Sequence, residues 1–569
     1  MKKSMLLGIV GCLVATSVFA ENYLLNGGQE STIQYSMVQT VTPSASTRKI
    51  MLSYVTPVSY SSPTYNQRIE NLDINFSPTP SSRKTTKDEN GNTIIEAAWN
   101  SPSDTITASV AMTAKNSVLL NTIKTDAPFP VTDMPAAVKK YLADTSQVPA
   151  DNPKIRQKAE ELTRSAKTQF DAVQLILTWV VDHMRYVQPP QSYDAMYAFD
   201  SGKGNCQNYS HLTAALMRAV GIPARIVNGV TLDEPYKIRQ GDGTLVMKNA
   251  KGRHSWIEAY FPDLKWVPFD PQCTQLFVSN RFIRVEVGVD NNDTENDGLI
   301  RWTRLKGSSD KPDFREAISA DFVSDTVSIA GKNTGYGPKN KLLGPHVSAA
   351  FKKTAVAVKE PEPVKLTPDQ MRALTYSEPY VFGNLEFPEN LDFQSARANV
   401  EQAPDGTMKM VKNFLVETAE YVTTQGKKYA QSFVLEKPVR LKSIGLALHN
   451  FSAGGQLWVE LTKSSNGIPA DPIATSDLIT VSDLSHKPGY RWVDFDFSDE
   501  EIILLPGRYW AALGFTGGPI VNWFFSYGKP TGPQDGTRYN TMFGKKWSHS
   551  LAFEFNYRIK GRIPKQFVE

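Results

Sequence analysis

The chain has 569 residues, of which 41% are hydrophobic and 21% are charged, and its formal net charge is +4. This composition excludes a disordered chain, and the small charge excludes a strong field that would recruit nucleic acid or an acidic membrane. The length exceeds that of one core and predicts roughly three or four domains. Three cysteines are too few for a scaffold built on disulfides.

Residues 1–20 have the pattern of a secretory signal peptide. Two lysines precede an apolar run that ends in the small-residue cleavage site 18–20. Cleavage there would remove both lysines, lower the net charge from +4 to +2, and release an exported protein, either periplasmic or secreted. A lipoprotein anchor at Cys12 is the alternative, which we disfavour because the apolar run continues past Cys12. No later run reaches the ~18 apolar residues of a transmembrane segment.

Residues 21–133 are rich in short alternating runs. Examples are 49–55, 93–99 and 105–112, and the turn residues 88–92 directly precede the second of these. Such spacing predicts an immunoglobulin-like β-sandwich. Its role could be to bind a partner or to brace its neighbour, and we favour bracing.

A helical period follows. Ile155, Ala159 and Leu162 lie on one face of an amphipathic helix, and Thr168 with Asp171 forms a capping box ahead of a second helix. Helices therefore lead into the part of the chain that holds a cysteine.

Cys206 follows a glycine-rich turn and takes the first position of a third expected helix. Asn205 is a good N-cap, and Gly221 ends the helix. A helix start favours thiolate over thiol and offers N–H donors to an oxyanion. Cysteines are also common as small buried hydrophobes, so this stretch alone leaves both interpretations open.

Strands follow the cysteine helix, which indicates an α+β arrangement. The runs 225–230, 255–260 and 265–270 surround a polar insertion, 233–253. His254 begins one strand and Asp270 ends the next, so across a short turn they would be neighbours. A thiol nucleophile needs such a base and such an orienting carboxylate.

Four separate blocks carry a resemblance to a known family. They are Gly204-Asn-Cys206, 221–225, His254-Ser-Trp256 and 266–271. Together they resemble the transglutaminase-like superfamily, whose core is similar to that of papain-type cysteine proteases, over about residues 134–290. The resemblance implies Cys206 as nucleophile, His254 as base and Asp270 as its orienting residue. We place this domain at 134–303.

The oxyanion donors are less defined. The Cys206 backbone N–H is a natural first donor. True transglutaminases use a tryptophan as the second, and this chain has none between Trp179 and Trp256. Gln188 and Tyr193 are the candidates that remain. Packing or solvent accounts for the two other histidines of this region, His183 and His211.

Cys273 lies three residues beyond Asp270. A disulfide with Cys206 would hold the thiol in reserve until it is reduced. A zinc site formed by the two cysteines with His254 and Asp270 lacks the short paired spacings of zinc motifs. We therefore expect neither a metal nor another cofactor.

The remaining chain is expected to hold two further parts. The acidic loop 290–297 lacks the glycine and the terminal glutamate of a calcium-binding EF-hand loop, so we expect a solvated hairpin loop. Residues 304–375 show no clear period and predict a linker or an irregular wrap.

Residues 376–569 carry many short aromatic strands, including 430–435, 457–461, 492–497 and 509–513. They look like a jelly-roll β-sandwich, a module that often binds glycans. Its five tryptophans sit within strand patterns, so we expect them to fill the core more often than to contact a glycan.

The sequence thus predicts an exported multidomain enzyme whose Cys-His-Asp triad acts on a polypeptide or glycopeptide. Hydrolysis of a peptide or side-chain amide is the first expectation, because no pocket for an amine donor is evident. Transamidation or deamidation of glutamine is the second. A binding or scaffold protein that uses the same fold without catalysis is the alternative of another class.

Overall fold

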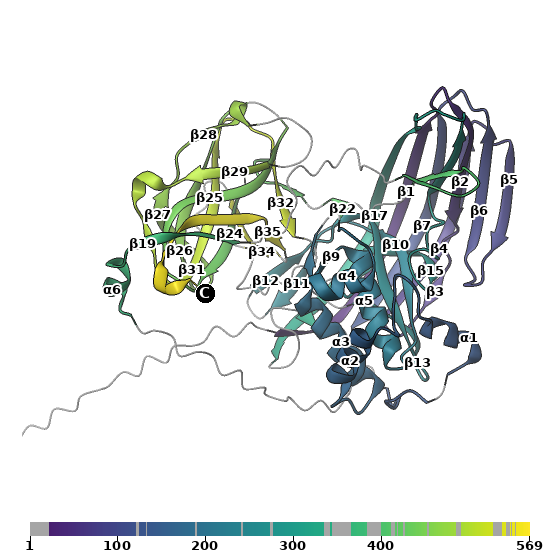
Figure 1. Cartoon of the computed structure of the whole chain (residues 1–569), viewed down its shortest axis with the longest axis horizontal. Coiled ribbons are helices and arrows are strands. Elements are labelled where there is room, and N and C mark those ends of the chain that lie inside the picture. The colour runs from purple at the N-terminus through teal and green to yellow at the C-terminus, as the bar shows by residue number, and fades with distance from the viewer. Residues whose placement is uncertain are drawn as a thin grey trace, which may run out of the picture.

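The computed structural model describes residues 22–120, 125–132, 134–187, 190–240, 243–272, 277–334, 342–343, 366–383, 400–410, 416–417, 419–424, 427–451, 454–484, 491–526, 537–541, 547, 549–551 and 553–568. The molecule is rich in strands and has several units (Figure 1). A strand-rich unit lies on each side of the view, and most of the helices lie between and below them. Residues 1–20, expected to be a signal peptide, lie outside the described part.

The N-terminal β unit consists of two sheets that share one hydrophobic core. One sheet has the order β17 (Asp313–Thr334), β1 (Asn22–Thr42), β7 (Ile106–Leu120), β4 (Tyr65–Ser77) and β3 (Tyr60–Ser61). The other has the order β20 (Val400–Gln402), β21 (Met408–Met410), β16 (Leu299–Arg304), β2 (Thr47–Val55), β6 (Thr93–Asn100) and β5 (Ser82–Lys87). The expected strands at 49–55, 93–99 and 105–112 are confirmed.

The expectation of a linker over 304–375 is wrong for 313–334. These residues form β17, which pairs antiparallel with β1 from Asn22↔Thr334 to Thr42↔Asp313. The strand is half exposed, with large apolar residues at only some alternate positions, so its period is weak in the sequence. The N-terminal β unit is therefore completed by chain that follows the central unit.

The central unit packs helices on an antiparallel sheet. The sheet has the order β14 (Lys265–Phe269), β13 (Lys251–Phe261), β10 (Ala224–Thr231) and β15 (Phe282–Gly288), and β22 (Val416–Glu417) also pairs with β13. The main helices are α2 (Pro153–Thr163), α3 (Gln169–His183) and α5 (Cys206–Ala219). Their apolar stripes share a core with strand residues such as Ile226, Ile257 and Phe269.

Local sequence explains where the helices start. Asn152 caps α2 by accepting a hydrogen bond from the Lys154 N–H, with Pro153 at the first helical position. The capping box of Thr168 and Asp171 is present at the start of α3, as the sequence predicts.

The polar insertion forms a hairpin that joins the units. β11 (Tyr236–Gln240) pairs with β17, and β12 (Gly243–Met247) pairs with β34 (His549–Leu551). β34 continues through β33 (Thr537–Thr541) to β24 (Lys427–Leu435) of the C-terminal β unit. One hydrogen-bonded path of strands therefore crosses the whole molecule.

The acidic loop 290–297 is packed, so the expectation of a solvated loop is wrong. Asp290, Asn291, Thr294 and Asp297 are buried. The Asn228 amide donates to the carbonyl oxygen and the hydroxyl of Thr294, both at 2.7 Å. The polar side chains of the loop are thus packed and hydrogen-bonded in the interior of the protein.

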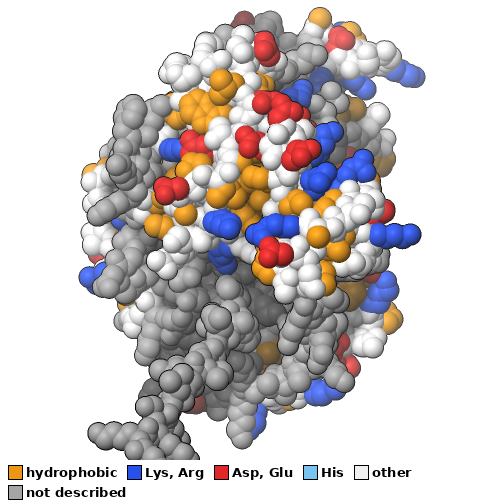
Figure 2. All heavy atoms as spheres, turned by 90° about the vertical axis from the view of Figure 1, so that its left-hand side faces the viewer, with side chains coloured by type: hydrophobic (Ala, Val, Ile, Leu, Met, Phe, Trp, Pro, Cys, Tyr) orange, Lys and Arg blue, Asp and Glu red, His pale blue; other side chains and the backbone are white. Residues whose placement is uncertain are grey.

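The C-terminal β unit also consists of two sheets around one core. The first contains β27 (Ile468–Thr475), β26 (Gln456–Ser465), β31 (Gly507–Thr516) and β24; the second contains β19 (Tyr376–Gly383), β36 (Tyr557–Pro564), β25 (Val439–Asn450), β32 (Val521–Ser526), β23 (Ala419–Tyr421) and β29 (Arg491–Asp496). On this side of the molecule hydrophobic side chains lie among lysine, arginine, aspartate and glutamate (Figure 2).

The five tryptophans of this unit divide into two groups. Trp510 and Trp523 are fully buried, as expected. Trp458, Trp492 and Trp547 are half-buried. None of the helices in the described part of the chain is long and apolar enough to span a membrane.

Candidate active site

Cys206 occupies the first position of α5. The Asn205 side chain accepts a hydrogen bond from the Gln207 N–H at 3.1 Å and also caps the N–H of Asn208, whose own side chain accepts from the Asn205 N–H at 3.1 Å. The cap engages the second and third amides of the helix and does not use that of Cys206. The Cys206 N–H is one of the first amides of the helix, which have no partner within the helix itself.

Glycine is required just ahead of the cysteine. A Cβ at Gly204 would lie 2.3 Å from the Cβ of Asn208, the residue that closes the capping box. The close approach of the turn to the helix start thus explains the Gly-Asn-Cys motif.

His254 lies on β13, and Asp270 follows β14. The His254 Nε2 and the Asp270 Oδ2 are 2.9 Å apart, and Oδ1 of the same carboxylate accepts a hydrogen bond from the Gln272 N–H at 3.0 Å. Both carboxylate oxygens are thereby fixed, which fixes the plane of the imidazole. The expected cross-strand neighbours do meet.

The Cys206 sulfur lies close enough to His254 to raise the pKa of its imidazole. Cys206, His254 and Asp270 are each 0% exposed, and Cys206 is a free thiol. The structure therefore brings the three expected site residues together in a buried chain of contacts.

The charge state of His254 follows from these neighbours. Burial lowers the pKa of its imidazole, but the Asp270 carboxylate and the Cys206 sulfur outweigh burial and raise the pKa from 6.5 to about 10. At neutral pH the ring is an imidazolium that can hold an adjacent thiolate.

Two aromatic residues surround the imidazole. The ring of Phe282 meets it edge-on at 5.2 Å between centroids, and that of Trp256 lies at 5.9 Å. The sequence did not single out Phe282; the only hint was its place in an apolar strand near the motif.

The segment 192–194 is held beside the cysteine by α5 itself. The Asn208 amide donates to the carbonyl oxygens of Ser192 and Asp194 at 2.9 and 3.1 Å, and His211 Nδ1 is 2.7 Å from that of Tyr193. Burial and the sulfur of Cys206 raise the pKa of the Tyr193 hydroxyl to about 12. Tyr193 is thus near the thiol and protonated, whereas Gln188 and Cys273 lie outside the described residues.

The two other histidines have structural surroundings, as expected. His183 stacks on Trp179 at 4.4 Å, and its Nε2 is 2.9 Å from the Phe199 carbonyl oxygen. His211 Nε2 accepts from the Asn291 N–H at 3.3 Å, and burial lowers its pKa to about 4. His211 is therefore neutral and joins the 192–194 segment to the loop 290–297.

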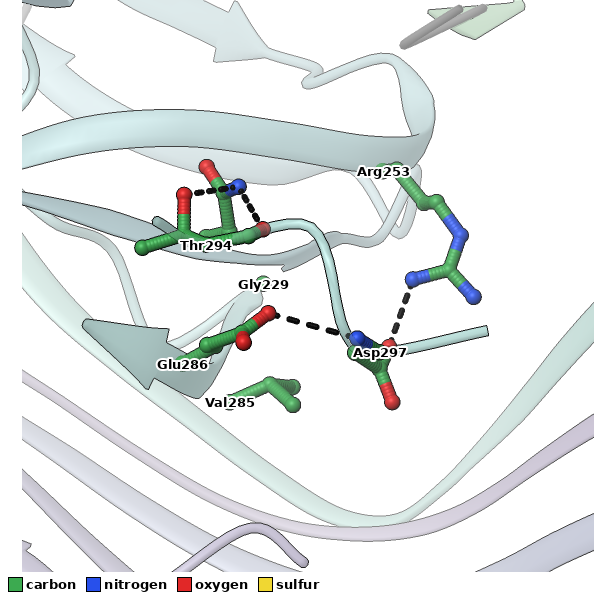
Figure 3. Close-up of a pocket in the computed structure, with 7 residues that line it drawn as sticks. Gly229, Arg253, Val285, Glu286, Thr294 and Asp297 are labelled. Atoms are coloured by element: carbon green, nitrogen blue, oxygen red, sulfur yellow. Dashed lines mark hydrogen bonds and ion pairs between the residues drawn. The ribbon is translucent and has the colours of Figure 1, made fainter. Parts of the chain in front are cut away.

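A small polar cavity is lined by Arg253, the residue before His254, and Cys206 is not among its lining residues. Its walls include Gly229, Arg253, Glu286, Thr294 and Asp297 (Figure 3). Adjacent residues of a strand point to opposite faces, so Arg253 leads away from the imidazole of His254. In the described residues no cluster of three or more His, Cys, Asp or Glu could hold a metal ion.

Comparison with known proteins agrees with the motifs. Residues 156–271 match the model of the transglutaminase-like superfamily. A protein-glutamine gamma-glutamyltransferase of Pseudomonas aeruginosa is 31% identical over 126 residues, which cover 21% of this chain and 18% of that protein. The chain thus spans less than a fifth of this curated relative.

Solved structures give weaker likenesses. An inferred cysteine protease of Cytophaga hutchinsonii is 19% identical with a TM-score of 0.36, and the match covers 56% of this chain and 97% of that one. The periplasmic domain of TgpA from Pseudomonas aeruginosa is 15% identical with a TM-score of 0.23, covering 42% and 90%.

Proposed function

Because residues 156–271 form a transglutaminase-like core, we propose that the chain is a cysteine-dependent acyl-transfer enzyme that hydrolyses peptide or side-chain amides. The observation that carries this proposal is the position of His254 between Asp270 and the Cys206 thiol. A base that is oriented by a carboxylate and lies close to a thiol at a helix start is the arrangement that thiol acyl transfer requires.

In the first half-reaction the Cys206 thiolate attacks the carbonyl carbon of the amide. The carbonyl oxygen takes the negative charge, and the Cys206 N–H donates to it. The C–N bond then breaks while the His254 imidazolium gives its proton to the leaving amine. The products are a free amine and a thioester on Cys206.

We assign the second oxyanion donor to the Tyr193 hydroxyl. Its raised pKa keeps the proton available for donation, and Asn208 and His211 hold its segment against α5. This side chain stands in for the tryptophan that the sequence lacks between residues 179 and 256.

In the second half-reaction water attacks the thioester. Neutral His254 accepts a proton from the water, the C–S bond breaks, and the carboxylic acid leaves with the Cys206 thiolate restored beside the imidazolium. Water is the proposed acceptor because the sequence offers no recognisable site for an amine donor.

The test compares a cellular proteome treated with wild type and with Cys206→Ala, read by mass spectrometry. We expect new peptide termini or Gln-to-Glu conversions only with wild type. We expect His254→Ala to abolish them as completely as Cys206→Ala does. Identical proteomes under all three treatments would favour a binding or scaffold protein instead.

Transamidation is the second candidate, and one observation favours it: the relative that is 31% identical over 126 residues is named a protein-glutamine gamma-glutamyltransferase. Incubation of casein with a labelled primary amine distinguishes the two reactions. Label on glutamine that depends on Cys206 would replace hydrolysis as the assigned reaction.

We further propose that Cys273 can hold Cys206 in reserve as a disulfide under oxidising conditions. Alkylation of Cys206 should then increase after treatment with a reductant. Equal labelling with and without reductant would dismiss this role.

The surrounding parts of the chain are assigned by the same kind of inference. The signal-like residues 1–20 support export to the periplasm or medium. We assign an immunoglobulin-like topology to the N-terminal β unit and a jelly-roll topology to the C-terminal one. A polypeptide or glycopeptide is the proposed substrate, and the half-buried Trp458, Trp492 and Trp547 are the candidates for glycan contact.

A further inference from the structure

Arg253 immediately precedes His254 on β13. Its guanidinium points away from the imidazole, since neighbours in a strand alternate between faces. The residue is only 8% exposed. A buried arginine is costly unless each of its donors is paired, so its partners define a strong local constraint.

The partners of Arg253 come from the N-terminal β unit and from the loop 290–297. Glu316 on β17 accepts two hydrogen bonds in a fork, from Nε at 3.0 Å and from Nη2 at 2.9 Å. Asp297 accepts from Nη1 at 2.5 Å, as Figure 3 shows. Gln39 on β1 donates to the same Glu316 carboxylate at 2.6 Å. We call these four residues, Arg253, Glu316, Asp297 and Gln39, the clamp. The clamp ties β13 to two strands of the N-terminal β unit.

This clamp is both rigid and directional. A bidentate pair of guanidinium and carboxylate fixes distance and plane together, unlike a single point contact. Because Arg253 and His254 share a peptide bond, any shift of the clamp along β13 moves the imidazole relative to Cys206.

A second contact from the same unit reaches the imidazole ring. The Tyr65 hydroxyl and the Asn116 amide donate to the Phe282 carbonyl oxygen at 2.7 and 2.8 Å. The Phe282 ring in turn meets His254 edge-on at 5.2 Å. The N-terminal β unit thus supports His254 from its neighbour in the strand and from the side of its ring.

We propose that Arg253 and Glu316 are positioning residues through which the N-terminal β unit holds the base of the active site. This inference rests on the proposed function, because it assigns the clamp to the working geometry of His254 and Cys206. It gives the N-terminal β unit a catalytic purpose in place of simple bracing. Displacement of a reacting group by about 1 Å can cost up to about a hundredfold in rate.

The test measures the rate at which iodoacetamide alkylates Cys206 between pH 5 and 10, in the full chain. Glu316→Gln keeps the size of the side chain and removes its charge. We expect a loss of about tenfold in the alkylation rate at pH 6.5, where reactivity depends on the imidazolium beside the sulfur. Arg253→Met should give a larger loss, and Arg253→Lys, which keeps the charge, should restore part of it.

The matched control is Arg218→Met. Arg218 is also a buried arginine, but it bonds to the carbonyl oxygens of Ala224 and Ala143 at the far end of α5. It should lower the melting temperature and leave the alkylation profile of Cys206 unchanged. Circular dichroism at the assay temperature shows which variants are folded.

The outcomes separate the two proposals. If folded Glu316→Gln alkylates at the wild-type rate at every pH, Arg253 and Glu316 are structural only and the inference is overturned. If the pH profile of alkylation in wild type gives an apparent thiol pKa at or above ~8.5 that His254→Ala leaves unchanged, the proposed function fails first. Should Arg253→Met not fold, Glu316→Gln and Arg253→Lys still decide the question.

Discussion

Replacement of Asp270 by asparagine tests the central arrangement with little change in shape. The amide oxygen of the new side chain can still accept a hydrogen bond, but the side chain lacks the negative charge that stabilises the imidazolium of His254. Burial lowers the pKa of His254, and the Asp270 carboxylate is the largest of the influences that raise it to about 10. Without that carboxylate, the pKa should return to its usual 6.5 or lower.

The size of the effect follows from the two pKa values. At pH 7.5 a group with a pKa of about 10 is almost fully protonated, and a group with a pKa of 6.5 is about one-tenth protonated. We therefore expect Asp270→Asn to lower the alkylation rate of Cys206 at pH 7.5 by at least about tenfold. The hydrolysis rate should fall further, because the ring also loses its orientation.

The assay is timed alkylation followed by mass spectrometry of the peptide that contains Cys206. Asp263→Asn is the matched control, since Asp263 lies in the turn between the same two strands and binds Thr125 and Asp126 instead of the site. A folded Asp270→Asn protein that alkylates within twofold of wild type at pH 7.5 would refute the assigned role.

Four further predictions concern stability. The raised pKa of His254 means that its stabilising effect is complete below pH 6.5 and is lost as the pH rises toward 10. The lowered pKa of His211 means that stability falls as the pH drops from 6.5 toward 4. Urea unfolding measured across pH should show that His254→Ala removes the first pH dependence and His211→Asn the second, and an unchanged pH dependence would contradict the assignment. Glu258→Gln leaves the largely buried Arg225 and Arg284 uncompensated and should cost about 3–5 kcal/mol in urea unfolding, and a loss below about 1 kcal/mol would show that solvent reaches them. Trp523→Ala removes a fully buried ring that stacks on Phe555 at 4.2 Å between centroids, and it should lower the free energy of unfolding by about 3–5 kcal/mol. Calorimetry that resolves the unfolding transition of the C-terminal unit would contradict this if that transition did not move.

The sequence predicted the site because the site is built from local patterns. Asn205 and Asn208 cap the helix that starts at Cys206, and a short hairpin brings His254 to Asp270. Each feature depends on residues close in the chain, where capping and alternation have clear periods. The four motif blocks then pointed to a family whose model matches residues 156–271.

The long-range pairings could not be predicted in this way. β1 and β17 are nearly 300 residues apart, and the exposed face of β17 carries mixed polar residues. In the sequence Arg253 is only the last residue of the polar insertion 233–253, because its partners Glu316 and Asp297 become visible only after the sheets assemble. Burial of the 290–297 loop was hidden for the same reason: polar side chains are buried when distant partners satisfy them.

The strand path through the polar insertion has a mechanical consequence. A force applied to the C-terminal β unit would be transmitted through backbone hydrogen bonds to the central and N-terminal units. The link between β12 and β34 consists of the two parallel pairings Leu245↔Ser550 and Val246↔Leu551. A second short pairing joins β22, which lies just before β23 of the C-terminal unit, to β13 at Lys251 and Gly252. A load on the C-terminal unit would therefore also pull on β13 close to His254.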